Sequence, residues 1–405
     1  METGPGVTRS QDAADDIHGS DPWATISARL GVLQVVPEMR PSGPARATVD
    51  VAAGVVAAGG RAVVVSAGGR LVADLLRCGA THITMPLPAD NGLGRWATAR
   101  RLVKLIREHR IAIVHARVPG MAWLSKRAAE EAGVPYTLTC HGLFEEISTD
   151  TKRNGLLEQA AKVIAVSETA ADHIMDRHRI QGRPAVIAPG IDLARFDPAR
   201  VSAERMMHLA QAWRLPDGRP IVMLPGRIAR SRGHGPLIEA LGLIAERDFH
   251  CVFAAEDKAS PGYAAELAHL AERHRLETRL VLGEDCRDMA AAYMLADVVI
   301  YARADAAGFA RVVAEAQAMG RPIVAYDSPL LREHTGEARM TWLVPPGDRG
   351  ALAQSIGEAL DLSAAERQAL APEASTIARR RYNHAAAAAA MIEVFVDLLG
   401  RAKAA

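Results

Sequence analysis

One stretch of the chain combines small residues and arginines in a way that suits phosphate binding. It runs from Pro225 to Gly233, reads Pro-Gly-Arg-Ile-Ala-Arg-Ser-Arg-Gly, and directly follows an apolar run typical of a buried strand. Glycines let a phosphate approach the backbone, while Arg227, Arg230 and Arg232 can give charge-assisted hydrogen bonds to a diphosphate. We therefore predict a diphosphate clamp here, with an ordinary solvated turn as the alternative.

Glu315 is a second candidate for binding chemistry. It lies inside an apolar helical segment beside Val312 and Val313, where an unpaired carboxylate is costly. Carboxylates hold ribose hydroxyls in dinucleotide-binding folds, and this is the role that we predict for Glu315. The alternative is an ion pair with Arg311 or Arg321.

His141 is a third candidate. It follows the apolar run 136–139 and precedes Gly142, so its imidazole is expected to reach a cleft at the end of a strand. An imidazole can donate or accept a hydrogen bond near neutral pH, which suits support of a reacting group. A histidine that caps a helix or binds a backbone carbonyl is the structural alternative.

The elements around these residues have a regular order. Short apolar runs alternate with longer segments of helical spacing, which predicts parallel sheets covered on both faces. Ligands of such sheets bind beyond the carboxyl ends of the strands. We expect an α/β protein with two Rossmann-like, doubly wound domains. The expected strands are 31–36, 62–66, 111–115, 136–139, 163–166 and 186–188, then 220–224, 250–254, 280–283, 297–301, 322–325 and 342–344.

The same pattern sets the expected domain boundaries. Residues 1–28 contain several aspartates and no apolar core of a signal peptide, so they are predicted to be a disordered tail. Residues 29–195 and 196–382 are predicted to form the two domains, which meet in a stretch rich in Pro and Gly. Residues 383–405 are predicted to form a helix that packs back toward the first domain.

Composition restricts the function classes. A length of 405 residues with 49% hydrophobic and 23% charged residues is typical of a globular protein of two domains. The formal net charge of +1 gives no support for nucleic-acid binding. Four cysteines without a CxxC pair, and no apolar run long enough to span a bilayer, predict a cytoplasmic protein.

Taken together, the motifs resemble the retaining glycosyltransferases of family 4, also described as group 1. The matching segments are, in order, His115-Ala116-Arg117, His141-Gly142, Pro225-Gly226-Arg227, Arg232-Gly233, Phe309 to Glu315, and Met319-Gly320-Arg321-Pro322. The resemblance covers nearly the whole chain after residue 30.

The resemblance implies a GT-B fold, in which two Rossmann-like domains face a central cleft and the second holds most of a nucleotide sugar. It implies no cofactor and no metal. The implied donor-binding residues are Gly226, Arg227, Arg232, Glu284, Arg287, Gly308, Phe309, Ala310 and Glu315, with Glu284 and Arg287 beside the base. The implied catalytic residues are His141, Arg227 and Arg232, and the acceptor side of the cleft has Gly43, Arg117 and His141.

The chain departs from the family pattern at the sugar end of this site. Ala307 stands where the family has the first glutamate of its Glu-x7-Glu motif, and Ala310 replaces an expected glycine. Asp305 could substitute for the glutamate only if its loop shifts. The family's Gly-Gly-x-Glu loop is Gly-Pro-Ala-Arg here, so Pro44 removes a backbone donor and Arg46 reverses a charge.

The leading hypothesis is a cytoplasmic, retaining glycosyltransferase of bacterial cell-surface polysaccharide assembly. It would move a hexose from a nucleotide sugar to a glycan or glycolipid acceptor. A catalytically silent homologue that binds nucleotide sugars as a regulator or partner subunit is the alternative, and a related epimerase or phosphorylase is a third possibility. The basic segment 95–110 leaves open a peripheral contact with the inner membrane, although such a stripe is more often a solvated helix face.

Overall fold

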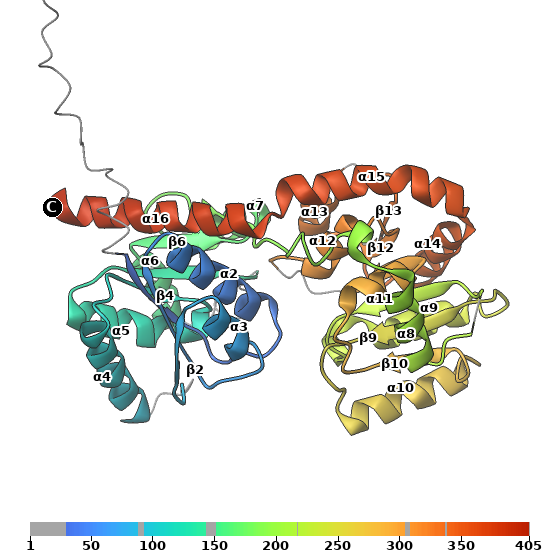
Figure 1. Ribbon diagram of the computed structural model, residues 1–405, viewed down its shortest axis with the longest axis horizontal. Helices are drawn as coiled ribbons and strands as arrows, with labels where there is room; N and C mark the ends of the chain where they lie inside the picture. The colour runs from blue at the N-terminus through green and yellow to red at the C-terminus, as the bar shows by residue number, and fades with distance from the viewer. Residues whose placement is uncertain are drawn as a thin grey trace, which may run out of the picture.

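The computed structural model (Figure 1) describes residues 30–87, 93–142, 151–216, 218–303, 308–336 and 338–404. The predicted tail over residues 1–28 lies outside the described residues, and so do Asp305 and Ala307. The described chain forms two α/β domains, each built on one parallel sheet. This arrangement confirms the expected fold class.

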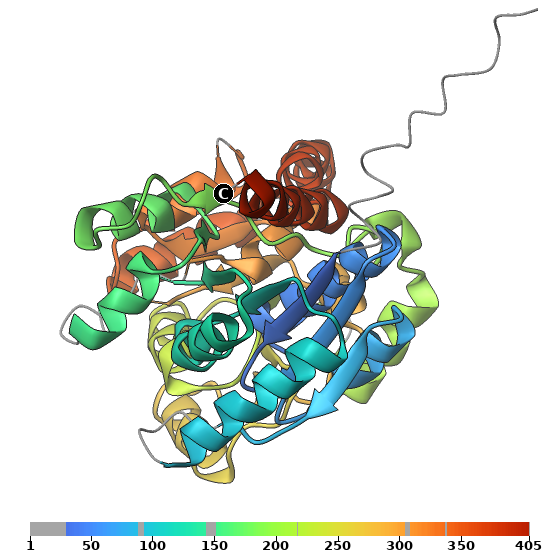
Figure 2. The ribbon, with the colours of Figure 1, turned by 90° about the vertical axis from the view of Figure 1, so that its left-hand side faces the viewer.

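The sheet of the first domain has the strand order β3-β2-β1-β4-β5-β6-β7. Figure 2 shows this domain with helices flanking its strands. Its strands are β1 (Gly31–Val35), β2 (Arg61–Ser66), β3 (Thr81–Thr84), β4 (Ile113–Ala116), β5 (Tyr136–Cys140), β6 (Lys162–Ala165) and β7 (Ala185–Val186). Its helices are α2 (Gly43–Ala57), α3 (Val72–Arg77), α4 (Leu93–Glu108), α5 (Ala122–Ala132), α6 (Thr151–Glu158) and α7 (Glu168–Arg177), with the short 3-10 helix η1 (Pro119–Met121).

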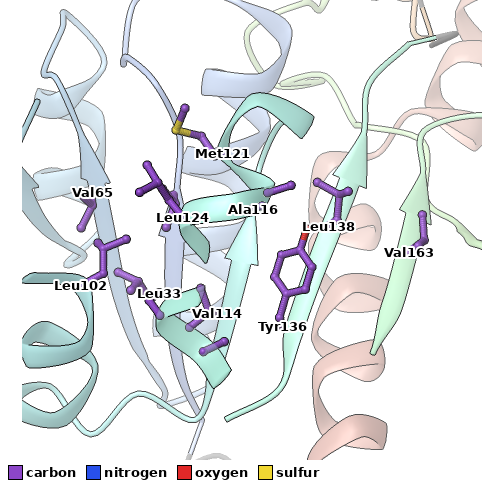
Figure 3. Packing of buried hydrophobic residues seen from close by; sticks show 14 of the residues in the cluster. Leu33, Val65, Leu102, Val114, Ala116, Met121, Leu124, Tyr136, Leu138 and Val163 are labelled. Carbon is purple, nitrogen blue, oxygen red and sulfur yellow. The ribbon is translucent and has the colours of Figure 1, made fainter. Parts of the chain in front are cut away.

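Both faces of this sheet are buried because successive strand residues point to opposite sides. Leu33 of β1 packs in a cluster with Leu102 of α4 and Leu138 of β5, as Figure 3 shows. Its neighbour Val32 packs on the other face in a cluster with Phe395. Continuous apolar runs of this kind are the reason that the strand pattern was visible in the sequence.

The sheet of the second domain has the order β10-β9-β8-β11-β12-β13. Its strands are β8 (Ile221–Pro225), β9 (His250–Ala254), β10 (Leu280–Gly283), β11 (Val298–Tyr301), β12 (Ile323–Tyr326) and β13 (Thr341–Val344). Its helices are α8 (Ala203–Ala212), α9 (His234–Gly242), α10 (Pro261–Arg273), α11 (Met289–Leu295), α12 (Arg311–Ala318), α13 (Pro329–Thr335) and α14 (Arg349–Asp361), with the 3-10 helices η2 (Pro198–Arg200) and η3 (Arg230–Arg232).

Two further helices follow the second domain's sheet in the chain. Figure 1 shows α15 (Ala364–Arg381) over the second domain and α16 (His384–Ala404) over the first. Met391 and Phe395 of α16 are buried in the core cluster that contains Val32 and Val51. The last helix therefore completes one face of the first domain.

The chain crosses between the domains at two places that lie side by side. The amide of Ile191 donates to the carbonyl of Tyr382 at 2.8 Å, and Nδ1 of His384 lies 2.9 Å from the carbonyl oxygen of Ile191. Among the described helices, none combines the length and the apolar character needed to span a bilayer.

Candidate functional site

In each sheet the strand order reverses beside its first strand, at β1 and β4 and again at β8 and β11. Such switch points open a crevice at the carboxyl ends of the strands, where ligands of doubly wound sheets bind. A cleft of about 560 Å³ lies here, lined by residues of both domains. The residues predicted from the sequence that line it are Gly43, His141, Gly226, Arg227, Arg232, Phe309, Ala310 and Glu315.

The loop after β8 turns sharply because of its glycines. Gly226 has φ +111° and Gly233 has φ +87°, values that favour glycine, and a Cβ on Gly233 would meet the carbonyl oxygen of Ala302 at 2.1 Å. The exposed side chain of Arg227 and the half-buried side chain of Arg232 line the cleft. Two cationic side chains thus reach the position predicted for a diphosphate.

Arg230 of the same loop lies elsewhere. It forms an ion pair with Glu266, and its guanidinium carbon lies 5.0 Å from the centre of the Tyr263 ring. It does not line the cleft. Of the three arginines in the predicted clamp, only Arg227 and Arg232 face the site.

Glu315 lies on α12 and is 7% exposed. The hydroxyl of Tyr293 donates to its Oε2 at 2.9 Å, and burial raises the pKa of Glu315 although the nearby charge of Arg311 opposes the shift. Arg321 donates instead to the carbonyls of Met319 and Ala296. Tyrosine is therefore the hydrogen-bonding partner of this carboxylate, and one edge of Glu315 lines the cleft.

The turn before α12 joins the two domains. The amide of Gly308 donates to the carbonyl of His141 at 3.1 Å, and a Cβ on Gly308 would lie 2.6 Å from that carbonyl group. The next amide but one, that of Ala310, donates to Nε2 of His334 at 3.4 Å. Phe309 packs against the ring of His334 with centroids 5.0 Å apart. These contacts fix the backbone that leads into α12.

His141 follows β5, as the sequence predicted, and lines the cleft. Burial and the charges of Arg117 and Arg311 hold the pKa of His141 well below its ordinary value. Its Nε2 is buried and has no hydrogen-bond partner among the described residues. The imidazole is therefore neutral at physiological pH and can act through hydrogen bonds rather than through charge.

Arg117, predicted on the acceptor side of the cleft, is a buried residue. It is 1% exposed and lies among the residues around a cavity of about 20 Å³, together with Asp50 and His141. Burial lowers its pKa to about 10 against the opposing field of Asp50. Arg117 directly follows β4, and it is not among the residues that line the cleft.

The segment predicted as a Gly-Pro-Ala-Arg loop is the first turn of α2. Ser42 caps this helix by accepting a hydrogen bond from the amide of Ala45 at 3.3 Å. Proline is well suited to this turn, because the first amides of a helix have no partner inside it. The absence of an amide donor at Pro44 therefore costs the fold little stability. Helix α2 begins earlier than the spacing of its apolar residues suggests.

Arg46 crosses the cleft to Glu256, which follows β9. Its Nη2 contacts both carboxylate oxygens, and Nη2 of Arg195 lies 3.4 Å from Oε1. Burial alone would raise the pKa of Glu256, but the two arginines outweigh it and hold the pKa below its ordinary value. Arg70 adds a 3.1 Å hydrogen bond to the carbonyl of Glu256. Arg46, which reverses the charge of the family pattern, thus has an acidic partner in the opposite domain.

Glu284 and Arg287, predicted to lie beside the base, are not among the residues that line the cleft. Oε1 of Glu284 accepts a hydrogen bond from the amide of Ala259 at 2.8 Å, and it fixes the loop after β9. Arg287 is exposed, and its carbonyl lies 3.4 Å from Nη2 of Arg195.

Several cleft residues were not predicted from the sequence. They are Arg195, Glu256, Asp257, Arg303 and Arg311. Glu256, Asp257 and Arg303 follow the strands β9 and β11, so the rule that ligands bind at the carboxyl ends of strands could have found them. Among the described residues, no group of three His, Cys, Asp or Glu is placed to bind a metal ion. Independence from metals stays a prediction.

Two family models match consecutive parts of the chain. Residues 41–195 match the model described as Glycosyltransferase Family 4, and residues 219–361 match Glycosyl transferases group 1. The D-inositol 3-phosphate glycosyltransferase of Xylanimonas cellulosilytica is 29% identical over 300 residues, which are 69% of this chain and 71% of that protein. The 2-deoxystreptamine glucosyltransferase of Streptomyces kanamyceticus is 25% identical over 294 residues, 65% of this chain and 72% of that protein.

Solved structures with the same fold are also similar over nearly the whole chain. A glycosyltransferase from Rickettsia africae aligns with a TM-score of 0.82 and 24% identity, over 92% of this chain and 99% of that one. Anabaena Alr3699/HepE in complex with UDP and glucose aligns with a TM-score of 0.79 and 20% identity, over 90% of this chain and 99% of that one.

Proposed function

The chain belongs to the family 4 and group 1 glycosyltransferases of the GT-B fold, and on this basis we propose that it transfers a hexose from a nucleotide sugar with retention of configuration. The acceptor is a glycan or glycolipid, and the setting is the assembly of bacterial cell-surface polysaccharide. The complex of Anabaena Alr3699/HepE with UDP and glucose supports a nucleotide sugar as the donor.

The observation that carries this proposal is the shared cleft of Arg227, Arg232 and Glu315. Two arginines at the end of β8 can bind a diphosphate, and a carboxylate on α12 can accept hydrogen bonds from a ribose. When the bond from sugar to phosphate breaks, negative charge develops on the diphosphate. Arg227 and Arg232 stabilise this developing charge without having to move. This electrostatic part of catalysis requires no metal.

His141 has a supporting role in this proposal. Its neutral imidazole and its carbonyl lie at the domain contact with Gly308, next to the turn that leads into α12. A sugar between the diphosphate and the first domain would lie beside this histidine. His141→Ala is therefore expected to lower kcat more than it raises the Kd of a nucleotide.

Titration calorimetry with UDP, GDP, ADP and dTDP tests the donor site directly. At least one diphosphate is expected to bind, and Arg227→Ala is expected to raise its Kd about ten-fold or more, because a charged hydrogen bond is lost. Arg230→Ala is the matched control, since Arg230 pairs with Glu266 outside the cleft. If no diphosphate binds the wild type, the donor site does not exist as proposed.

A silent homologue is the second candidate, and Ala307 is the observation that favours it. A site that lacks one hydrogen-bonding partner for the sugar can lose orders of magnitude in rate. Donor hydrolysis and transfer should therefore be measured for the wild type and for Ala307→Glu. A wild type without turnover that gains activity in Ala307→Glu favours the silent homologue, whereas measurable wild-type transfer excludes it. Proton NMR of the product then reports its anomeric configuration.

Helix α4 supports a peripheral contact with an anionic membrane. It exposes Arg100, Arg101, Lys104 and Arg107, and Trp96 near its start is 50% exposed. Each basic residue near an anionic surface contributes about 1 kcal/mol, and tryptophan favours the interface. Cosedimentation with vesicles that contain phosphatidylglycerol should exceed that with neutral vesicles. Substitution of Arg100, Arg101 and Lys104 by glutamine should remove the difference, and equal sedimentation of both proteins would exclude this contact.

A further inference from the structure

The cleft contains an arginine whose hydrogen-bonding edge is unused. Arg311 is the first residue of α12 and lines the cleft. Its Nε and Nη2 are buried, and neither donates to a described residue. Glu315 and Asp50 act on Arg311 through their charges, but neither carboxylate hydrogen-bonds to it in the described structure. Buried donors of this kind usually have a partner.

The two unused atoms form one edge of the guanidinium. The same edge binds carboxylates elsewhere in this protein. Nε and Nη2 of Arg205 lie 2.8 and 2.7 Å from the two carboxylate oxygens of Asp288, and Arg332 holds Asp327 in the same way. Two parallel N–H groups match the two oxygens of a carboxylate or phosphate. Arg311 therefore presents a fork that suits an oxyanion.

The position of Arg311 separates it from the diphosphate clamp. Arg227 and Arg232 belong to the loop after β8, whereas Arg311 and Glu315 are four residues apart on one face of α12. Arg311 lies toward the start of this helix, close enough to His141 for its charge to act on the imidazole. It also lines a second hollow of about 510 Å³ together with Arg46 and Asp50. Arg311 therefore lies on a different element from the clamp, one helical turn before Glu315, and it lines both hollows.

We infer that Arg311 binds a second oxyanion, a carboxylate or phosphate that is carried by the transferred sugar or by the acceptor. This inference rests on the proposed function, because the ribose at Glu315 and the diphosphate at Arg227 define which end of the cleft takes the sugar. The substrate class is therefore an anionic sugar, either a donor with a uronate or an acceptor with a sugar phosphate.

Calorimetry with matched ligands and variants tests the inference. The ligands are UDP, UDP-glucose, UDP-glucuronate, glucose 6-phosphate, glucuronate and glucose. The variants are Arg311→Gln, which removes the fork, Arg311→Lys, which keeps the charge without it, and Arg230→Gln, which removes a charge outside the cleft. Thermal unfolding of each variant checks that it is folded.

Two results support the inference and identify the source of the oxyanion. If the wild type binds UDP-glucuronate about ten-fold or more tightly than UDP-glucose, the oxyanion is carried by the donor. If the UDP-loaded protein binds glucose 6-phosphate but not glucose, the oxyanion is carried by the acceptor. In either case Arg311→Gln and Arg311→Lys should lose the preference, while Arg230→Gln keeps it and the Kd of UDP changes less than about three-fold in every variant.

Other results overturn the inference or the proposed function separately. If the wild type shows no preference for any anionic sugar, or if Arg311→Gln weakens UDP as much as UDP-glucuronate, Arg311 does not bind a second oxyanion. If no nucleotide binds but glucose 6-phosphate or glucuronate binds the free protein in an Arg311-dependent way, the oxyanion site stands and the nucleotide-sugar function fails.

Discussion

A carboxylate as deeply buried as that of Glu315 needs a hydrogen-bond donor to be tolerated in the folded protein. Tyr293 supplies it at 2.9 Å. Glu315→Gln keeps an acceptor for Tyr293, so the free energy of unfolding should change by less than about 1 kcal/mol, whereas the Kd of the bound nucleotide should rise about ten-fold. Urea unfolding and calorimetry measure the two quantities.

Tyr293→Phe is the companion variant. It removes the donor and leaves the carboxylate, so it should cost about 1 to 3 kcal/mol of stability. A Glu315→Gln protein that binds nucleotide like the wild type would show that Glu315 is a core residue and does not hold the ribose.

His334 gives a prediction about pH. Nδ1 donates to the carbonyl of Leu330, Nε2 accepts from the amide of Ala310, and burial lowers the pKa of His334 to about 4. Its unfolded pKa is about 6.5, so the unfolded chain takes up the proton first as the pH falls. The stability that neutral His334 contributes above pH 6.5 is therefore lost progressively as the pH falls to 4. Between pH 7.5 and pH 5, the free energy of unfolding falls by about 2 kcal/mol.

Urea unfolding at both pH values measures this loss. His334→Gln keeps an acceptor and a donor without a group that titrates, so its stability should fall by about 2 kcal/mol less than that of the wild type over the same interval. Equal losses in both proteins would mean that His334 takes no part in the pH dependence.

The sequence predicted some site residues and not others for a physical reason. Arg227 and His141 directly follow apolar strands, and local pattern therefore locates them. The pair of Arg46 and Glu256 joins residues 210 positions apart, and nothing local in either segment indicates its partner. Pairing across a cleft depends on how two domains meet, which a residue pattern does not contain.

At the level of elements, the apolar runs predicted the central strands but not β3. Its residues Thr81–Thr84 lie at the edge of the first sheet and are partly exposed, so the strand has no continuous apolar character. The start of α2 has no apolar pattern either, because Gly43 and Pro44 suggest a turn, whereas the Ser42 cap starts a helix there. Fold class and family were predicted and are confirmed, since they depend on many elements and motifs together.

The paired domain crossings give a prediction for elements. A Cβ on Gly190 would lie 2.0 Å from the Cα of His384, where α16 begins. Because the obstacle is backbone, Gly190→Ala must push the two crossings apart and should lower the free energy of unfolding by about 3 kcal/mol or more. Gly262→Ala is the control, because no atom lies within 4 Å of its Cβ position, and a helical alanine is expected to be neutral or stabilising.

Urea or thermal unfolding compares the two glycine variants. A Gly190→Ala protein as stable as Gly262→Ala would show that the crossings are loosely packed. Helix α16 begins at this crossing and covers the face of the first domain that contains Val32 and Val51, so a displaced crossing would also disturb this core.

At the scale of the whole molecule, the two domains are held together by groups on both sides of the cleft. Glu333 of α13 caps α7, with its oxygens accepting from the amides of Glu168 and Thr169 at 2.9 and 3.0 Å. Glu256 inside the cleft pairs with Arg46 and Arg195. Domains of one chain move relative to each other unless their interface is large and apolar. The closed arrangement of the two domains around the cleft is therefore expected to depend on these charged contacts.

Glu256→Gln tests this dependence. It removes the charge that Arg46 binds across the cleft, so the free protein should sample more open arrangements and show a larger radius of gyration by small-angle X-ray scattering. A bound diphosphate supplies new negative charge for the arginines of the cleft and should restore the compact form. Glu266→Gln breaks an exposed Glu–Arg pair within one domain and is the matched control. If Glu256→Gln scatters like Glu266→Gln without nucleotide, the pair across the cleft does not hold the domains together, and closure depends on Glu333 and the two crossings.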